Sequence, residues 1–348
     1  MRVAITNVQV PFIAGGGEAL AVGLRQAFLA HGHDADIITL PFRYAPTSSI
    51  HGSMREWESL SLENWTGYAV DLVVPLRFPA WLAFHPRTHP WVLHQHRAVY
   101  DLWETSMTGD DVANQFQQER LRTAIHHADT LAFSRCMRVH TISSTIANRL
   151  KKFSGVSAET LYHPPPDATD FYTESARPYI YFPSRFESLK RQRLVIEAMA
   201  KVRSPVQLVL SGNGGQLPQA QALVNRLGLA DRVKLLGRVS DAERIGLYAH
   251  AMAVAFTPLD EDLGYVTLEA MLAQKPVITC TDSGGPTEFV IDDITGSICA
   301  PEAHAIAEAI DALFTDQDRA RRMGIAGRER YDSLGMSWEN VVDTLIAA

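Results

Sequence analysis

Residues 258–288 read PLDEDLGYVTLEAMLAQKPVITCTDSGGPTE, and this stretch decides the fold class of the chain. The apolar run just before it predicts a buried strand over 253–257, which is followed by a loop. The pattern then predicts a helix over 265–273 and a second buried strand over 277–280. A strand, a helix and another buried strand in succession are typical of a parallel α/β sheet with crossover helices.

The same alternation extends along the whole chain. In the second half we also expect strands over 179–183, 206–211 and 233–236, and helices over 191–202, 216–227 and 241–249. In the first half we expect strands over 2–6, 35–40, 70–75, 91–96, 139–143 and 160–163, and helices over 18–30 and 144–152. After Pro301 the chain is expected to be helical only, ending in an amphipathic segment over 337–348.

A proline-rich break separates the two halves. The sequence HPPPDATD at 163–170 holds three consecutive prolines, which cannot join a helix or a central strand. A chain of 348 residues has room for about two domains. We therefore predict an N-terminal domain over 1–165, a C-terminal domain over 166–330 and a helical segment over 331–348 packing across the junction. Two such doubly wound domains would bind a ligand in a cleft between the carboxyl ends of their strands.

The composition restricts the class of protein. Apolar residues make up 46% and charged residues 20%, which is typical of a globular chain. The net charge is −7 without a basic stripe, which argues against a nucleic-acid partner. The three cysteines lack the spacing of a disulfide framework or a zinc site. Because no apolar run approaches the about 20 residues of a membrane span and no signal-peptide core follows Met1, we expect a cytoplasmic protein.

The quoted stretch also contains candidate binding residues. The expected helix starts near Tyr265, and its unpaired backbone N–H groups would form an anion site. Glu269 lies one turn into this helix, where a carboxylate beside a bound anion makes sense if it accepts hydrogen bonds from sugar hydroxyls. Alternatively, Glu261 and Glu269 are solvated acids that the helix dipole favours near an N-terminus.

A second cluster follows the first strand of the C-terminal half. The sequence PSRFESLKR at 183–191 places Arg185 at the strand end and Lys190 at the next helix start. Two cations there could converge on one phosphate and stabilise a departing diphosphate. The alternative is an ordinary basic helix start with both charges in water.

A third cluster, Gly15-Gly16-Gly17-Glu18, follows the first strand of the chain. Three glycines let the backbone approach a ligand and expose N–H groups before a helix. The stretch does not match a dinucleotide fingerprint, because Leu20 stands where GxGxxG needs a glycine. A simple turn between strand and helix explains it equally well.

Together these motifs resemble the retaining glycosyltransferases of family 4, which have the two-domain, Rossmann-like GT-B fold. The family's pair of glutamates with seven intervening residues is matched by Glu261 and Glu269. The cations of SRFESLKR are matched by Arg185 and Lys190, and the N-terminal GGxE loop by Gly15, Gly16 and Glu18. The Gly-Gly-x-x-Glu element is matched by Gly284, Gly285 and Glu288, and a later turn glycine by Gly296.

The resemblance implies roles for these residues. Arg185 and Lys190 would hold the diphosphate of a nucleotide sugar, and Glu269 would bind the ribose. Glu261 would hold the transferred sugar together with the backbone of 263–265. The other donor-binding positions that it implies are Gly16, Gly17, Gly212, Gly214, Arg238, Val239, Leu263, Gly264 and Tyr265. The family's catalytic histidine corresponds to His96, with His94 as the alternative.

The resemblance implies a retaining, metal-independent enzyme that transfers a hexose from a nucleoside-diphosphate sugar, UDP in preference to GDP. The acceptor would be a hydroxyl of a glycan or a polyprenyl-linked molecule in cell-surface polysaccharide biosynthesis, and no cofactor or metal would be needed. Peripheral contact with the inner membrane face is open, through Arg149, Lys151 and Lys152 with Trp57, Trp65 and Trp81. The preferred interpretation of these Trp is packing in the core or in the acceptor cleft. The alternatives are an epimerase or phosphorylase on the same fold, or a non-catalytic nucleotide-sugar sensor or scaffold.

Overall fold

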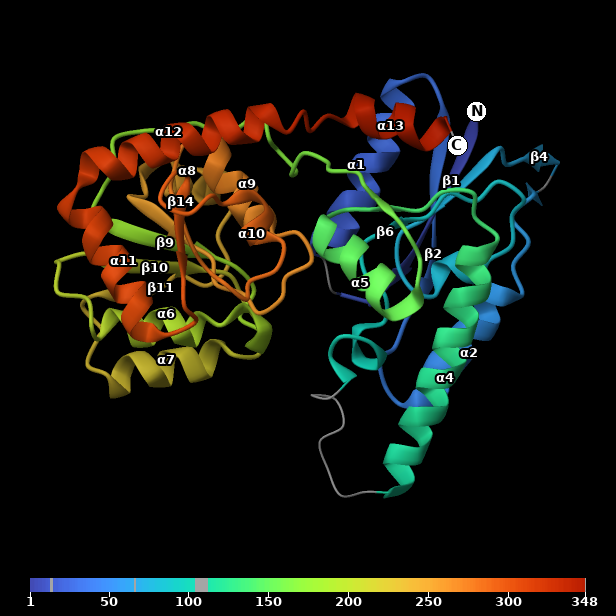
Figure 1. Ribbon diagram of the computed structural model, residues 1–348, viewed down its shortest axis with the longest axis horizontal. Helices are drawn as coiled ribbons and strands as arrows, with labels where there is room; N and C mark the ends of the chain where they lie inside the picture. The colour runs from blue at the N-terminus through green and yellow to red at the C-terminus, as the bar shows by residue number, and fades with distance from the viewer. Residues whose placement is uncertain (13–14, 66, 104–111, 348) are drawn as a thin grey trace. The chain divides into compact units, whose positions relative to one another are not determined.

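The computed structural model describes residues 1–12, 15–65, 67–103 and 112–347 (Figure 1). It divides into two compact units, the first formed by Met1–Pro166 with Ser337–Ala348 and the second by Asp167–Met336. The division of the chain falls one residue after the expected position of 165. Both units have parallel sheets with intervening helices, as the alternating pattern predicts.

Six parallel strands form the sheet of the second unit. They are β9 (Tyr179–Pro183), β10 (Gln207–Ser211), β11 (Val233–Leu235), β12 (Ala253–Ala255), β13 (Val277–Cys280) and β14 (Gly296–Cys299). Their order is β11-β10-β9-β12-β13-β14. The first five strands confirm the predicted ones, whereas β14 was not predicted. Its Gly296 lies against β13, where a β-carbon would come within 2.1 Å of the Val277 carbonyl oxygen. A glycine in a strand weakens the sequence signal but permits this close pairing.

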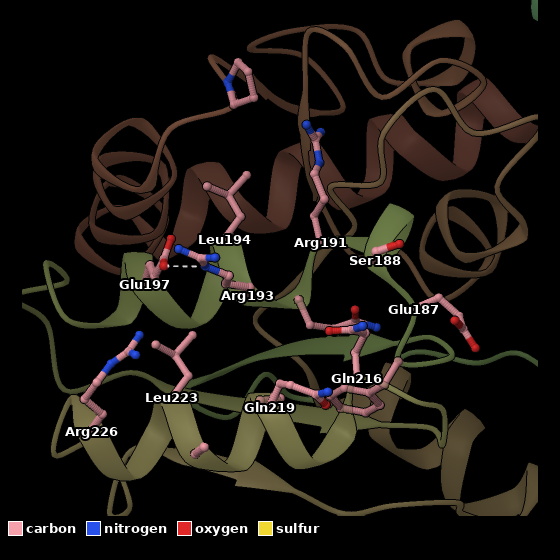
Figure 2. Close-up of a pocket in the computed structure, with 15 residues that line it drawn as sticks. Glu187, Ser188, Arg191, Arg193, Leu194, Glu197, Gln216, Gln219, Leu223 and Arg226 are labelled. Carbon is pink, nitrogen blue, oxygen red and sulfur yellow. Dashed lines mark hydrogen bonds and ion pairs between the residues drawn. The ribbon is translucent and has the colours of Figure 1, made fainter. Parts of the chain in front are cut away.

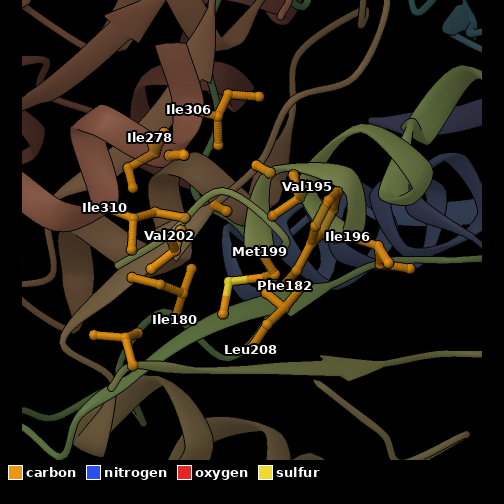
Figure 3. Close-up of a cluster of buried hydrophobic side chains, with 14 of the residues drawn as sticks. Ile180, Phe182, Val195, Ile196, Met199, Val202, Leu208, Ile278, Ile306 and Ile310 are labelled. Carbon is orange, nitrogen blue, oxygen red and sulfur yellow. The ribbon is translucent and has the colours of Figure 1, made fainter. Parts of the chain in front are cut away.

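The helices of the second unit follow the predicted positions. They are α6 (Gln192–Met199), α7 (Leu217–Arg226), α8 (Asp241–His250), α9 (Tyr265–Leu272), the short α10 (Pro286–Phe289), α11 (Ala303–Thr315) and α12 (Gln317–Ser333). A continuous buried apolar cluster joins the sheet to side chains of α6, α7 and α11 (Figure 3). The short α10 was not predicted, since it is a single turn.

The first unit holds two three-stranded parallel sheets. The first has the order β2-β1-β5, formed by β2 (Asp34–Pro41), β1 (Arg2–Gln9) and β5 (Leu72–Pro75). The second has the order β6-β7-β8, formed by β6 (Trp91–Val92), β7 (His140–Thr141) and β8 (Glu159–Thr160). Isolated bridges, such as Arg77 to His94, connect the two. All six predicted strands are present, although the last four are shorter than predicted.

Among the described residues of this unit, four α-helices precede the C-terminal segment. The sequence predicted α1 (Gly16–Ala30) and α5 (Ser144–Ser154), but not α2 (Thr47–Glu58) or α4 (Val112–Ser134). The hairpin of β3 (Asn64–Trp65) and β4 (Tyr68–Ala69) was also missed. A usable signal for α4 existed, because buried Leu121, Ile125 and Ala132 recur at helical spacing.

The C-terminal segment corrects the prediction of one helical piece over 331–348. Helix α12 continues to Ser333 within the second unit, and a separate helix α13 (Trp338–Ile346) belongs to the first unit. Ser337 caps α13 by accepting a hydrogen bond from the Asn340 N–H at 3.1 Å. Trp338 packs on α1 so closely that a β-carbon at Gly23 would lie 2.6 Å from its ring.

Candidate functional site

The candidate donor site lies where the strand order of the second unit reverses. Chain order runs outward from β9 through β10 to β11 on one side, and from β12 through β13 to β14 on the other. Strands β9 and β12 are therefore neighbours whose following loops leave in opposite directions, which is the position where doubly wound sheets bind ligands. Arg185 and Lys190 follow β9, and Glu261 follows β12.

The structure brings Lys190 and Glu261 into direct contact. The Lys190 ammonium donates to a Glu261 carboxylate oxygen at 2.5 Å, and the side chains are 18% and 21% exposed. The ammonium also lies 5.7 Å from the centre of the Phe256 ring. An ammonium group has three donors, so Lys190 can retain this contact and still donate to a phosphate oxygen.

Arg185 is presented differently. Its side chain is exposed, while its backbone carbonyl accepts a hydrogen bond from the Gln192 side-chain amide at 2.7 Å. This contact fixes the backbone at the end of β9 to the start of α6. The guanidinium is accordingly available to solvent and to a ligand at the same strand end as Lys190.

The fold of the free protein requires glycine at positions 212 and 214. Both have positive φ, and a β-carbon would lie 1.9 Å from the Ser184 carbonyl oxygen at Gly212 and 2.4 Å from the Phe186 carbonyl oxygen at Gly214. Phe186 N–H donates to the Asn213 carbonyl at 2.9 Å. These glycines therefore let the loop after β10 pack on the loop that carries Arg185.

The remaining candidate nucleotide-binding residues, Arg238 and Val239, follow β11. Gly212 N–H donates to the Gly237 carbonyl at 2.7 Å, which places Arg238 and Val239 beside the same group of loops. Arg238 is exposed and Val239 is partly buried. The loops after β9, β10 and β11 are thus connected by backbone hydrogen bonds along one edge of the sheet.

The loop that carries Glu261 is paired with the loop after β13. Glu261 N–H donates to the Ser283 carbonyl at 2.9 Å, and Gly285 N–H donates to the Glu261 carbonyl at 2.8 Å. A β-carbon at Gly284 would lie 2.6 Å from the Glu261 carbonyl oxygen, which explains the glycine pair. Gly284 also has a φ of +71°, a conformation that favours glycine.

Helix α9 begins directly after this loop. Gly264 precedes it with a φ of +88°, Leu263 is buried and Tyr265 is the first helical residue. The predicted sugar-binding positions 263–265 therefore form the N-terminus of α9. The N–H groups at the start of a helix point away from it and can donate to a ligand oxygen. In the free protein the Thr267 N–H donates to the Gly264 carbonyl at 2.9 Å.

Glu269 is buried one turn further along α9. Its two oxygens accept hydrogen bonds from Arg244 at 2.8 Å and from the Tyr248 hydroxyl at 2.5 Å. Burial raises the pKa of Glu269, an effect that the nearby Arg244 partly opposes. The alternative of a solvated surface acid is wrong for this residue. Carboxylate oxygens accept more than one hydrogen bond each, so a ribose hydroxyl remains a possible partner.

The glycine-rich turn of the first unit is held by an ion-pair network. Gly15 is the N-cap of α1, and its N–H donates to Glu18 at 2.9 Å. Glu18 also accepts from the guanidinium of Arg77, which donates in addition to Asn7 at 3.0 Å. Gly16 is exposed at the start of the helix. A β-carbon at Gly17 would come within 2.6 Å of Arg77, so this glycine makes room for the network.

The two candidate histidines have different environments. His96 is buried among the rings of Phe42, Tyr44 and Phe78, at centroid distances of 5.5 to 6.2 Å. Burial, with a contribution from His94, lowers the pKa of His96 to about 4. His94 is partly buried, and its Nδ1 lies 2.8 Å from the Gln95 carbonyl. His96 is therefore neutral at neutral pH.

Four residues around these sites were missed by sequence reasoning. Arg244 and Tyr248 surround Glu269, Arg77 holds the glycine-rich turn, and Arg191 joins the loops beside Glu261. Each of them reaches its partner across long sequence separation, so no local pattern indicated its role. Adjacency to Lys190 was the one signal available for Arg191.

The tryptophans weighed for a membrane surface belong to the core where they are described. Trp57 and Trp81 are buried, whereas Lys151 and Lys152 are exposed on α5. The Trp65 side chain lies outside the described residues. Within the described ranges, no helix is long and apolar enough to span a membrane.

A surface hollow of about 750 Å³ lies between α6 and α7 (Figure 2). Arg191, Arg193, Arg226, Glu187 and Glu197 are among the residues that line it. Lys190 and Glu261 do not line it. We therefore treat the switch point beside β9 and β12, and not this hollow, as the candidate site.

The chain has the GT-B fold, the fold of two-domain glycosyltransferases. Anabaena HepE in complex with UDP and glucose has a similar structure, with a TM-score of 0.72, 18% identity and full coverage of both chains. Residues 170–330, a little less than half of the chain, match the model of the glycosyl transferases group 1.

Curated relatives match shorter parts of the chain. The human alpha-1,3/1,6-mannosyltransferase ALG2 is 31% identical over 163 residues, which is 42% of this chain and 39% of the relative. The GDP-mannose-dependent alpha-(1-6)-phosphatidylinositol monomannoside mannosyltransferase of Mycobacterium tuberculosis is 32% identical over 226 residues, or 56% and 58% of the two chains. The match thus spans less than two thirds of either relative.

Proposed function

We propose that this protein is a retaining glycosyltransferase that moves a hexose from a nucleoside-diphosphate sugar to a hydroxyl of a glycan or lipid-linked acceptor in cell-surface polysaccharide biosynthesis. The observation that carries the proposal is the contact between Lys190 and Glu261 at the switch point, with Arg185 exposed at the same strand end. A cation for the diphosphate and a carboxylate for the sugar hydroxyls thus lie side by side. The match of residues 170–330 to the glycosyl transferases group 1 supports the same class of reaction.

The proposed reaction begins with donor binding. Arg185 and Lys190 hold the diphosphate, Glu269 accepts from the ribose, and Glu261 with the N-terminus of α9 holds the hexose. The bond between the anomeric carbon and the diphosphate oxygen breaks, and its electron pair leaves with the diphosphate. The two cations and the helix N-terminus stabilise this developing charge.

The acceptor hydroxyl then attacks from the face that the diphosphate leaves, so the anomeric configuration is retained. Its proton passes to an oxygen of the departing phosphate. The reaction needs no metal in this scheme, because the protein supplies the positive charge itself. Within the described residues, no three His, Cys, Asp or Glu side chains gather as a metal site, and metal independence stays a prediction.

The donor base and the acceptor belong to the proposal as well. HepE was solved with UDP and glucose, while the mycobacterial relative is named for GDP-mannose. We therefore propose a hexose donor with either base, and a thermal-shift panel of UDP, GDP, ADP, TDP and CDP with their common sugar conjugates tests it. A ligand that binds the native state raises its melting temperature.

One nucleotide hit that survives EDTA would support the donor class and metal independence. Transfer to a hydroxyl acceptor, with the anomeric configuration of the product read by NMR, would then support retention. Isomerised donor or released sugar phosphate would instead favour the epimerase or phosphorylase. Binding without any turnover would favour the sensor or scaffold, and the absence of any nucleotide hit would contradict the donor proposal.

A further inference from the structure

Arg191 has a backbone conformation that is unusual for its residue type. It precedes α6 with φ and ψ of +54° and +36°, in the left-handed region that favours glycine. Residues with a β-carbon persist in this region when surrounding contacts hold them, and such positions gather at functional sites. Contacts of the Arg191 side chain are therefore expected to hold this backbone conformation.

The guanidinium of Arg191 makes four hydrogen bonds, each 2.7 Å long. It donates to the carbonyl oxygens of Thr257 and Pro258 and to both carboxylate oxygens of Asp282. The side chain is 18% exposed, and its hydrogen bonds hold the pKa of Asp282 below the usual value. Neighbouring Arg193 instead pairs with Glu197 on its own helix, as the dashed line in Figure 2 marks.

The loops that Arg191 joins are the loops that carry and support Glu261. Pro258 lies three residues before Glu261, and Asp260 N–H donates to the Asp282 carbonyl at 2.9 Å. Leu259 N–H donates to the Leu189 carbonyl at 2.7 Å, which ties the same loop to the segment before Lys190. Arg191 thus directly follows Lys190 in sequence and holds the loop that carries Glu261, the ion-pair partner of Lys190.

We propose that Arg191 is a positioning residue that clamps the loops after β12 and β13 and so sets Glu261 against Lys190 for donor binding. The effect of Arg191 on donor binding rests on the proposed function. The effect of Arg191 on the order of the two loops does not depend on it. Removal of the clamp should loosen residues 257–264 and 281–285 and leave the sheet intact.

The test is Arg191→Gly, because glycine suits the backbone conformation and the variant should fold. Hydrogen exchange, resolved to peptides covering 257–264 and 281–289, is compared with the wild type. We expect exchange in these two peptides, which contain the Glu261 and Gly285 amides, to be at least tenfold faster, and exchange in β9 to be unchanged. The matched control, Arg193→Ala, removes a cation that is 78% exposed and should alter neither peptide by more than twofold.

Exchange within twofold of the wild type in Arg191→Gly would overturn the clamp, whether or not the protein binds a nucleotide. Should that variant fail to fold, Asp282→Asn and Arg191→Lys weaken the same bidentate contact, and unchanged exchange in both would overturn it equally. Donor affinity, measured by calorimetry, should fall at least tenfold in Arg191→Gly. Faster exchange with unchanged donor affinity would overturn the positioning role, whereas a wild type that binds no nucleotide sugar contradicts only the proposed function.

Discussion

The Lys190 ammonium lies 2.5 Å from a carboxylate oxygen of Glu261, although 70 residues separate the two in sequence. Each residue follows a strand of the same sheet, and the two strands, β9 and β12, are hydrogen-bonded neighbours. In the free protein Glu261 therefore balances the charge that we assign to diphosphate binding. A bound donor has to share Lys190 with this carboxylate.

Loss of either diphosphate cation should impair turnover. In Lys190→Ala or Arg185→Ala we expect turnover to fall at least about tenfold, because a charge-assisted contact contributes at least about 1.5 kcal/mol. Steady-state kinetics with the donor found in the panel measures the effect. Arg193→Ala serves as the control for a lost surface charge, and activity within about threefold of wild type in either variant would contradict the leaving-group role.

Tyr248 should stabilise the fold by its hydrogen bond to the buried Glu269 carboxylate. Removal of its hydroxyl in Tyr248→Phe leaves one oxygen of a buried carboxylate without a 2.5 Å hydrogen bond, which should destabilise the fold by about 1 to 3 kcal/mol. Denaturant unfolding measures this effect.

Glu269→Ala should chiefly weaken binding of the free nucleotide. Calorimetry measures this affinity, and unchanged nucleotide affinity in Glu269→Ala would remove this residue from the ribose.

Gly212 and Gly215 form a matched pair of glycines in one loop. A β-carbon at Gly212 would lie 1.9 Å from a backbone oxygen, whereas at Gly215 it would meet nothing within 4 Å. Gly212→Ala should therefore destabilise the fold by more than about 2 kcal/mol, and Gly215→Ala should change stability by less than about 0.5 kcal/mol. Equal melting temperatures for the two variants would show that the loops after β9 and β10 are not closely packed.

The buried histidines make the first unit sensitive to acid. Burial lowers the pKa values of His96 and His89 to about 4, while an unfolded histidine titrates near 6.5. The unfolded chain therefore binds protons more readily, and stability is lost as the pH falls from about 6.5 towards 4. Each histidine could contribute a loss of up to about 2 kcal/mol between pH 7 and pH 5.

Asp129 acts in the opposite direction. Burial raises its pKa to about 6, so its folded form holds a proton more readily and gains stability as the pH falls from about 6 to 4.

His96→Phe keeps a ring in the aromatic cluster and removes one titrating group. We expect its melting temperature to fall less than that of the wild type between pH 7 and pH 5. An equal fall in both proteins would show that His96 titrates normally.

Much of the fold could be predicted because parallel α/β sheets leave a strong local signal. Strands buried on both faces appear as apolar runs, and β9 and β13 match the predicted bounds. Strand β14 was missed because it starts at Gly296, which lacks a side chain to mark a strand. The amphipathic segment expected over 337–348 corresponds to α13, whereas the expected start of the C-terminal segment at 331 falls inside α12. The break between the two helices depends on which unit each helix packs against.

The sequence by itself determined the fold class and the two sets of strands, because apolar periodicity is a local property. It also determined the identity of the candidate donor residues, whose types and spacing match a known family. Only the tertiary structure decided that Lys190 meets Glu261, that Arg244 and Tyr248 enclose Glu269, and that Arg191 joins the loops after β12 and β13. These contacts arise where distant segments meet at one edge of a sheet, and strand order, which no local pattern encodes, sets which segments meet.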